Sequence, residues 1–225
     1  MACDEPGSWA DYAAGLGLDR PVSGSDLDTL VAFYRDRGRS PKIQITPYQH
    51  SSLLSGLASR GFTANELSTF LVHPLHGLKQ HQPTPGLTFC PIDPTSADDV
   101  SAFVDSQMLG FFDGKPPHLG AKPIARRVAT HDRSQLWLIK LHETIVGSGG
   151  LEMFEDSAVL IAGCINPEAR RQGLQREFIQ FRLKQAVEYG ARYATVGSVA
   201  GGPTERNALR AGFSIGFTHI DLKLP

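Results

Sequence analysis

Cysteine and long apolar runs are the scarce features of this sequence. Its 225 residues include three cysteines, Cys3, Cys90 and Cys164. Their number is odd, and they lie far apart in the sequence. Cys90 and Cys164 lie in apolar, strand-like stretches, so we expect reduced, buried thiols and no disulfide framework. No apolar run approaches the roughly 18 residues that a membrane-spanning helix needs. The sequence therefore predicts neither a disulfide-stapled secreted domain nor a membrane protein.

An excess of charge of either sign is also missing. The 22 Lys and Arg residues balance 23 Asp and Glu residues, which leaves a net charge of −1. This balance argues against a general nucleic-acid or acidic-membrane surface as a partner. The N-terminal segment MACDEPGSWADY contains acidic residues and no apolar core, which is atypical of a signal peptide. We therefore expect a cytoplasmic protein, whose 41% of hydrophobic residues can form an ordinary core.

Helix and strand patterns divide the chain into several predicted segments. We expect an N-terminal arm over residues 1–22, an α/β segment over 23–75, a linker over 76–86 and the main domain over 87–225. The linker prediction rests on the three prolines and two glycines between His73 and Gly86. The first α/β segment should contain, in order, a helix that starts at Ser25 or Asp26 and ends at Gly38, a strand at 42–45, a helix near 52–60 and a strand near 69–72.

Along the main domain, stretches with the apolar period of a strand alternate with stretches that have the period of a helix. We expect strands at 87–90, 135–141, 144–154, 158–165, 193–199 and 213–222. Helices are expected from Asp93 or Thr95 to Phe112, at 124–129, at 173–188 and in a short stretch that ends at Ala211. This order predicts a mixed α/β fold, in which helices cover the faces of a sheet.

A faint internal repeat connects the two segments. The order helix, Gly, strand, loop, short helix, Gly-Phe, strand occurs twice, and Gly38 and Gly61-Phe62 match Gly190 and Gly212-Phe213 at an offset of about 150 residues. Because helices often end in glycine, chance is the competing explanation. We favour a degenerate half-repeat, which makes residues 23–75 a partial copy of the second half of the main domain.

The stretch PEARRQGLQREF, residues 167–178, is the strongest candidate site. A strand precedes it and a helix follows it, so the free N–H groups and positive dipole end of that helix are available to an anion. Gly173 would let the backbone approach the anion closely, and Arg170 and Arg171 add positive charge. The pattern matches neither a Walker loop nor a dinucleotide fingerprint. The alternative is an exposed, solvated turn.

The segment INPEARRQGLQREFIQFRLKQAVEYG resembles the signature of the GNAT acyltransferases, [RQ]xxGx[GA] at the start of a long helix. The preceding LIKLHETIVGSGGLEMFEDSAVLIAGCI is similar to the family's antiparallel strands, and ERNALRAGFSIGF to its closing block. The likeness covers about residues 87–222. It implies the GNAT fold, a mostly antiparallel sheet that splays to form a slot, and an acyl-CoA whose pyrophosphate is the anion.

The resemblance also implies roles for individual residues. The backbone of Arg170, Arg171, Gln172, Gly173, Leu174 and Gln175 would hold the pyrophosphate. Cys164, Ile165 and Asn166 would pair with the pantetheine arm like an added strand. Asn207 would contact the cofactor near its thiol end. The side chain of Cys164 is expected to pack in the core rather than to act as a nucleophile.

Two positions depart from the family pattern. Gln175 occupies a position where Gly or Ala is usual. The tyrosine that many members use as a general acid is absent, since Ala208 and Leu209 lie in that neighbourhood. As general base we expect Glu152, in the strand GGLEMF near where the family often has a carboxylate, with Glu155 as the second candidate. An ordinary outward-facing strand residue is the alternative for Glu152.

Three histidines, His73, His76 and His81, lie within nine residues of one another. They fall in the Pro-rich linker, and no cysteine or carboxylate cluster joins them, so we expect no metal.

The sequence favours an N-acetyltransferase that uses acetyl-CoA as co-substrate. It would transfer the acetyl group to the amine of a small molecule by direct attack in a ternary complex. The alternative is a GNAT-fold protein that binds acyl-CoA or a partner and turns over weakly or not at all. The N-terminal segment is expected to shape the acceptor pocket or a dimer contact, and a homodimer is possible.

Overall fold

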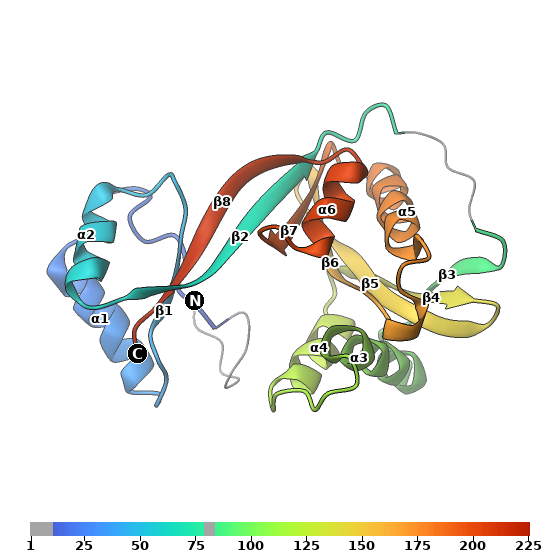
Figure 1. The fold of residues 1–225 in the computed structure, drawn as a ribbon, viewed down its shortest axis with the longest axis horizontal. Helices are drawn as coiled ribbons and strands as arrows, with labels where there is room; N and C mark the ends of the chain where they lie inside the picture. The colour runs from blue at the N-terminus through green and yellow to red at the C-terminus, as the bar shows by residue number, and fades with distance from the viewer. Residues whose placement is uncertain (1–10, 79–83) are drawn as a thin grey trace. The chain divides into compact units, whose positions relative to one another are not determined.

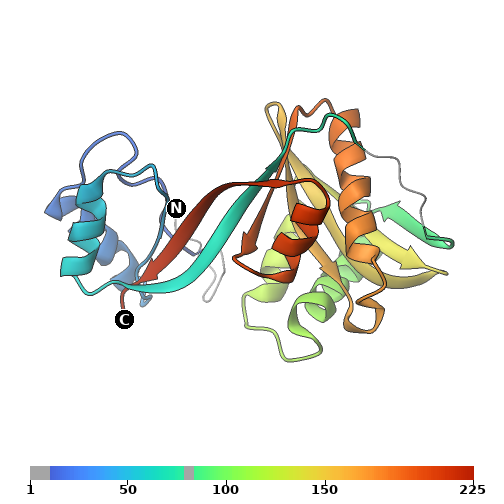
Figure 2. The ribbon, with the colours of Figure 1, turned by 45° about the horizontal axis from the view of Figure 1, so that its top comes forward.

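The computed structural model describes residues 11–78 and 84–225, which form two compact units (Figures 1 and 2). The first unit contains residues 11–70, 198–202 and 215–225, and the second contains 71–197 and 203–214, apart from 79–83. The spatial division therefore assigns part of the chain's C-terminal third to the first unit, whereas the sequence grouped all of 87–225. The predicted segment boundaries describe which parts of the chain share an evolutionary origin, and they stay a prediction.

The first unit is built on the order helix, strand, helix, strand. Its elements are α1 (Gly24–Arg35), β1 (Lys42–Ile45), α2 (Ser51–Ser59), most of β2 (Thr63–His73) and most of β8 (Ser214–Lys223). β1 and β8 are antiparallel, with a register that runs from Lys42 opposite Lys223 to Ile45 opposite Ile220. The apolar faces of both helices meet the strands in a small core around Leu27, Ile43, Leu53, Leu57 and Phe62.

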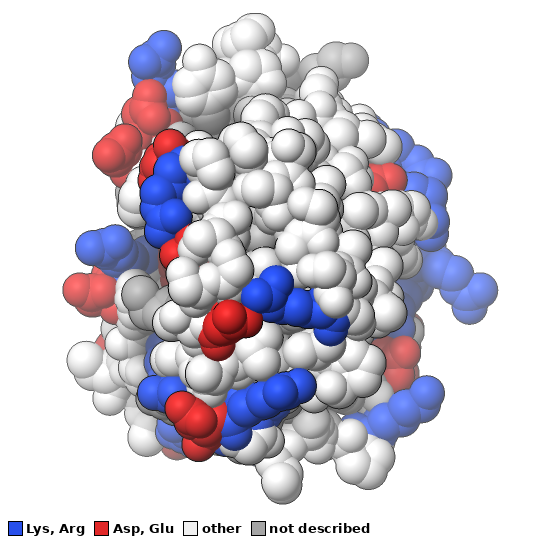
Figure 3. Space-filling view, turned by 90° about the vertical axis from the view of Figure 1, so that its left-hand side faces the viewer, with Lys and Arg blue, Asp and Glu red and all other residues white. Residues whose placement is uncertain are grey.

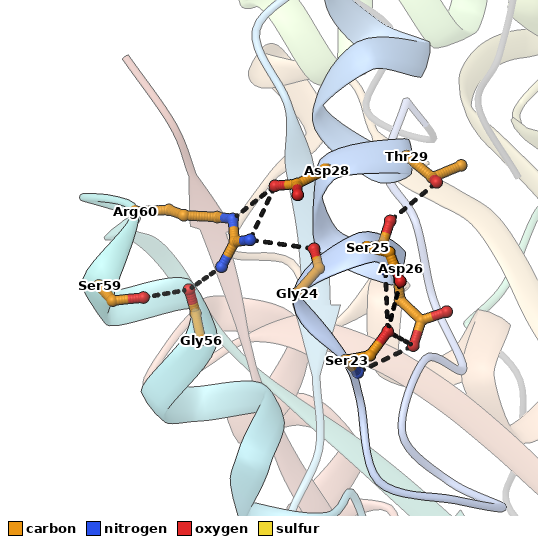
Figure 4. Close-up of polar contacts among 9 residues, drawn as sticks. All are labelled: Ser23, Gly24, Ser25, Asp26, Asp28, Thr29, Gly56, Ser59 and Arg60. Carbon is orange, nitrogen blue, oxygen red and sulfur yellow. Dashed lines mark hydrogen bonds and ion pairs between the residues drawn. The ribbon is translucent and has the colours of Figure 1, made fainter.

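Hydrogen bonds close the N-terminal end of α1 (Figure 4). The Ser23 hydroxyl accepts from the backbone N–H of Asp26, and the Asp26 carboxylate accepts from the backbone N–H of Ser23 at 2.9 Å. This reciprocal capping box satisfies helix-end donors that would otherwise lack partners. At the end of α2, Arg60 donates to the Gly24 carbonyl and to Asp28, so it ties the two helices together.

In the second unit, five consecutive strands of the sheet are covered by helices on both faces. The strand order is β7-β6-β5-β4-β3, and β6 pairs with β7 in parallel while the other pairs are antiparallel. The strands are β3 (Leu87–Pro91), β4 (Ser134–Leu141), β5 (Thr144–Phe154), β6 (Ser157–Ile165) and β7 (Tyr193–Val199). The sheet is therefore mixed and mostly antiparallel, as the sequence predicted.

Two helices cover each face of this sheet (Figures 1 and 2). α3 (Ala97–Phe112) and α4 (Ala121–Ala129) bury Val100, Phe103 and Ala129 against Leu136 and Leu138. On the opposite face, the larger core contains residues of α5 (Leu174–Glu188) and α6 (Pro203–Arg210), such as Phe178, Leu183 and Ala208. A single 3-10 turn, Pro167–Ala169, leads from β6 towards α5.

Several elements begin elsewhere than the sequence predicted, and α1 begins at Gly24 with Ser23 as its cap rather than Ser25 or Asp26. β2 begins at Thr63 rather than Thr69. The prediction missed its first five residues because they are exposed and show no apolar alternation. α4 begins at Ala121 rather than Ile124, since Pro123 is tolerated in a first turn. α3 is capped by Ser96, whereas Asp93 accepts hydrogen bonds from Thr95 in the turn before it.

Charges of both signs are mixed on the surface shown in Figure 3. Lys and Arg side chains lie beside Asp and Glu side chains there, and much of that face is uncharged. On this face no continuous basic field exists of the kind that binds nucleic-acid backbones. Within residues 11–78 and 84–225, no helix is both long and apolar enough to cross a membrane.

Candidate active site

The sheet of the second unit opens between β6 and β7. Their parallel pairing covers only Ser157 to Val159, which lie opposite Tyr193 to Thr195. β6 continues along β5 as far as Ile165, so beyond Val159 its other edge leaves β7. A cavity of about 140 Å³ lies in the resulting slot. It is lined by Phe111, Leu160, Ala162, Gly163, Gln175, Ile179, Arg182, Val196, Gly197, Thr204, Ala208 and Phe213.

An open helix N-terminus stands at one end of this slot. Gly173 precedes α5 with φ +83°, and no side chain caps the helix. A Cβ at Gly173 would meet nothing within 4 Å, so the space beside the backbone is open. Among the described residues, no acceptor binds the peptide N–H groups of residues 172–175. Free donors at the positive end of a helix fit a phosphate group.

The two arginines of the loop behave differently. Arg171 is exposed and has a φ of +63°. The Arg170 guanidinium instead donates to the carbonyls of Ile165 at 3.0 Å and Gly110 at 2.7 Å, and to the carboxylate of Asp113. It holds the pKa of Asp113 below its usual value. Arg170 therefore ties the end of α3 to the end of β6, and only Arg171 keeps a solvated guanidinium.

The edge of β6 places backbone groups in the slot. Asn166 donates its backbone N–H to the Val146 carbonyl of β5 at 2.8 Å. Peptide groups alternate between the two sides of a strand, so those of Ile165 point away from β5 and towards the slot. The Ile165 carbonyl already accepts from Arg170, which leaves its N–H as the donor on this edge. Of the three residues expected to pair with pantetheine, Ile165 has the suitable orientation, while Cys164 and Asn166 face β5.

The Cys164 side chain lies in a buried polar cluster rather than in the cavity. Its sulfur lies 3.5 Å from the Ser148 hydroxyl, and Gln107 donates to both groups. Burial raises the pKa of the Cys164 thiol, which disfavours the nucleophilic thiolate. This geometry agrees with the packing role that the sequence favoured.

Gln175 and Asn207, both expected to contact the cofactor, bind each other. The Asn207 amide donates to the Gln175 side-chain oxygen at 2.6 Å, and the Gln175 amide lies 3.4 Å from the Thr204 hydroxyl. These contacts bridge α5 and α6, and both Gln175 and Thr204 line the cavity. The residue that departs from the motif is therefore held away from the loop backbone by α6.

Glu152, the predicted general base, lies outside this cavity lining. It accepts a hydrogen bond of 2.7 Å from Ser134 on β4, and His131 Nδ1 lies 3.8 Å from the same oxygen. Its neighbour Leu151 belongs to the core under α5, so Glu152 faces the side of the sheet that α3 and α4 cover. The catalytic role of Glu152 stays a prediction.

The histidines of the linker are separated by their surroundings. His73 is buried, its Nδ1 accepts the backbone N–H of Leu75, and burial lowers its pKa. His76 is exposed, and His81 lies outside the described residues. In the part of the chain that the structure describes, no group of three His, Cys, Asp or Glu side chains could hold a metal ion.

Arg182 lines the cavity, although no sequence pattern singled it out. On α5 it was one of the charged residues between apolar positions, which usually face solvent. The structure buries it to 4% exposure. Gln175, Ile179 and Arg182 are four and three residues apart, and this spacing, which places them on one helix face, is the signal that could have found it.

Comparisons with known proteins identify the fold. No protein-family model and no curated protein sequence matches the chain. A GCN5-related N-acetyltransferase from Kribbella flavida superposes with a TM-score of 0.73 at 17% identity, over 99% of this chain and 84% of that one. A GCN5-related N-acetyltransferase from Sphaerobacter thermophilus gives 0.68 at 14%, over 89% and 68%. The tandem GNAT protein from the clavulanic acid biosynthesis pathway gives 0.62 at 11%, over 84% and 65%. With its splayed sheet and these structural relatives, the chain has the fold of the GCN5-related N-acetyltransferases.

Proposed function

We propose that this protein is an N-acyltransferase of the GNAT family, which transfers an acetyl group from acetyl-CoA to the amine of a small molecule. One observation carries the proposal: the slot between β6 and β7 starts beside the uncapped N-terminus of α5. A diphosphate needs such a helix end, and a thin, amide-bearing arm needs a slot with a free strand edge. Both features occur in one continuous site.

The residues of the loop and the slot would divide the binding between them. Free N–H groups of residues 172–175 would donate to the pyrophosphate, and Arg171 would add long-range attraction. The backbone N–H of Ile165 would bind an amide carbonyl of the pantetheine arm. Apolar side chains of Ile179, Ala208 and Phe213 would exclude water from the inner slot.

The acyl donor would supply an activated thioester carbonyl carbon. The neutral amine of the acceptor attacks this carbon, so a C–N bond forms and the C–S bond breaks. The amine loses one proton to a base, for which Glu152 is the candidate, directly or through water. The departing thiolate takes up one proton. N–H groups on the β6 edge that point into the slot would stabilise the oxyanion.

A second candidate function is acyl-CoA binding without efficient turnover. Among the described residues that line the cavity there is no carboxylate, histidine or tyrosine. A proton donor for the thiolate is therefore missing from the lining, and Asn207 is engaged by Gln175. In this second candidate function, the protein would bind acyl-CoA in the way described above but would not transfer the acyl group.

Calorimetric titration with CoA and acetyl-CoA, followed by a thiol-release assay over a broad amine panel, tests both candidates. We expect saturable binding, with a Kd between about 1 μM and 1 mM, and multiple turnovers with at least one amine. Turnover with any amine rejects the second candidate. No detectable binding of CoA rejects both.

Replacing Glu152 by Gln examines the base separately. The rate should fall most near and below neutral pH, where the amine is protonated and needs a base. Unchanged kinetics would remove Glu152 from the mechanism.

A further inference from the structure

The inner part of the slot contains a buried positive charge. Arg182 is 4% exposed, and its guanidinium carbon lies 4.3 Å from the centre of the Phe178 ring. Nη1 donates to the carbonyls of Gly150 at 3.2 Å and Ile161 at 3.4 Å. Nη2 has no hydrogen-bond partner among the described residues, and Arg182 is part of the cavity lining. Nε donates to the Phe178 carbonyl at 3.4 Å, so Nη2 is the donor of the guanidinium that is available to a ligand.

No anion in the described chain compensates this charge. No Asp or Glu side chain of residues 11–78 or 84–225 forms an ion pair with Arg182. The Cys164 thiol acts on Arg182 electrostatically, but burial raises the pKa of this thiol and so favours its neutral form. Burial lowers the pKa of Arg182 to about 9, so the guanidinium remains charged at neutral pH. A buried charge without a counter-ion is costly, and a bound anion would offset that cost.

The position of Arg182 along the slot indicates which anion it could meet. Gln175 and Arg182 are seven residues apart on one face of α5, which corresponds to about 10 Å along the helix. Gln175 is next to the pyrophosphate loop, whereas Arg182 reaches Ile161, two residues beyond the last parallel pair at Val159. An arm that starts at the loop would therefore bring its far end, the acyl group, to Arg182.

A small residue keeps this end of the slot open. Gly163 lines the cavity, and a Cβ there would lie 3.0 Å from both Nη1 and Nη2 of Arg182. A side chain at Gly163 would crowd the guanidinium edge. The methyl group of an acetyl thioester would need an apolar inner end of the slot. This end instead contains a glycine and an incompletely paired arginine.

We propose that the inner end of the slot binds a carboxylate on the acyl group, so that Arg182 selects a dicarboxylic acyl thioester such as malonyl-CoA or succinyl-CoA. This inference rests on the proposed transfer from an acyl-CoA and replaces acetyl-CoA by a dicarboxylic acyl thioester as the preferred donor. A carboxylate oxygen can accept a charge-assisted hydrogen bond from the free Nη2 of Arg182.

Calorimetric titration of the full chain, without acceptor, measures this selection. The ligands are free CoA, acetyl-CoA, malonyl-CoA and succinyl-CoA, with propionyl-CoA and butyryl-CoA as uncharged thioesters of matched length. We expect malonyl-CoA or succinyl-CoA to bind at least about tenfold more tightly than its uncharged match. Equal or weaker binding of both dicarboxylic thioesters overturns the inference while the proposed function stands. If no CoA compound binds, the proposed function fails and this inference fails with it.

Two variants locate the selection. Arg182→Gln should remove the preference for the carboxylate and leave the Kd of butyryl-CoA within about threefold, since only the charged contact is lost. Lys184→Gln removes a charge from an exposed position of the same helix and should keep the wild-type preference. If Arg182→Gln does not fold, Arg182→Lys takes its place and should reduce the preference without abolishing it, because lysine keeps the positive charge but lacks the planar guanidinium that places Nη2. A full preference in the folded variant, or its loss in Lys184→Gln, assigns the selection to another group and overturns the role of Arg182.

Discussion

The N-termini of α1 and α5 both carry the positive end of a helix dipole, but the chain caps only the N-terminus of α1. At α1, the chain itself supplies the anion: Asp26 accepts from the Ser23 backbone, and the Ser23 hydroxyl caps the helix (Figure 4). Asp26 also accepts from Arg20. At α5, Gly173 supplies no side chain and residues 172–175 keep their N–H groups free. Both helices start the order helix, strand, helix, strand.

The difference indicates how a binding site can be closed or kept open. One carboxylate and one hydroxyl suffice to occupy the helix end that would otherwise attract a phosphate. If residues 23–75 descend from a copy of the second half, as the sequence suggests, the copy has filled its anion site internally. The open end at α5 then carries the binding, and substitutions at each end should affect different properties.

The largest expected effect is at Gly173. Gly173→Glu places a carboxylate beside the proposed pyrophosphate and forces a non-glycine residue to φ +83°. Repulsion at this distance should weaken CoA binding by roughly 100-fold or more. Calorimetry measures the Kd, and far-ultraviolet circular dichroism checks the fold.

Gly190→Glu is the matched control for that variant. Gly190 follows α5 at its other end with φ +86°, and a Cβ there also meets nothing within 4 Å. The backbone strain and the added charge are the same, yet CoA binding should persist. Wild-type affinity in Gly173→Glu, or an equal loss in both variants, would remove the pyrophosphate from the α5 end.

Substitutions of the adjacent residues Arg170 and Arg171 should have intermediate effects on CoA binding and on stability. Arg171→Ala should weaken CoA binding about three- to tenfold at low ionic strength, and less at high salt, because the contact is exposed and screened. Arg170→Ala should instead lower the thermal midpoint, since it removes the donors to Ile165, Gly110 and Asp113. Titrations at two salt concentrations and thermal melts separate the two. The reverse pattern would show that Arg170 is the phosphate ligand.

The smallest effect concerns the closed end. Hydrogen bonds from Arg20 and then Ser23 hold the pKa of Asp26 far below its ordinary value. A depressed pKa stabilises the fold at pH values above the ordinary carboxyl range, and this stabilisation is lost as the pH falls through the folded-state pKa. Asp26→Asn should therefore be less stable than wild type at neutral pH, and the difference should shrink below about pH 4. Denaturant unfolding at several pH values measures this, and a pH-independent difference would contradict it. CoA affinity should not change.

Much of the fold could be predicted because turns mark its elements. The bounds of β1, β5 and β7 agree with the sequence interpretation. His142 and Glu143, and Glu155, adopt positive φ in the two hairpin turns. Thr63 to Leu67 of β2 could not be predicted, because strand residues that are exposed on both faces leave no alternating pattern.

The site was less predictable than the fold, for a physical reason. The glycine of the loop and its helix are local features, so the sequence alone located them. The partners of side chains depend on tertiary contacts. Arg170 turns to α3, Gln175 to α6 and Arg182 to the sheet carbonyls, and each of these directions comes from elements far away in the chain. A charge pattern on a helix could not distinguish buried Arg182 from exposed Lys184.

The splayed edge of β6 has a consequence for solubility. Between Leu160 and Ile165 this strand presents peptide groups to a slot instead of to a neighbouring strand. Unpaired edges are templates for edge-to-edge aggregation. A ligand that lies along β6 would occupy that template, and at 100 times its Kd it would add about 2.7 kcal/mol to the stability of the folded state. If a CoA thioester is that ligand, as proposed, its concentration would also affect the stability and the aggregation of the protein.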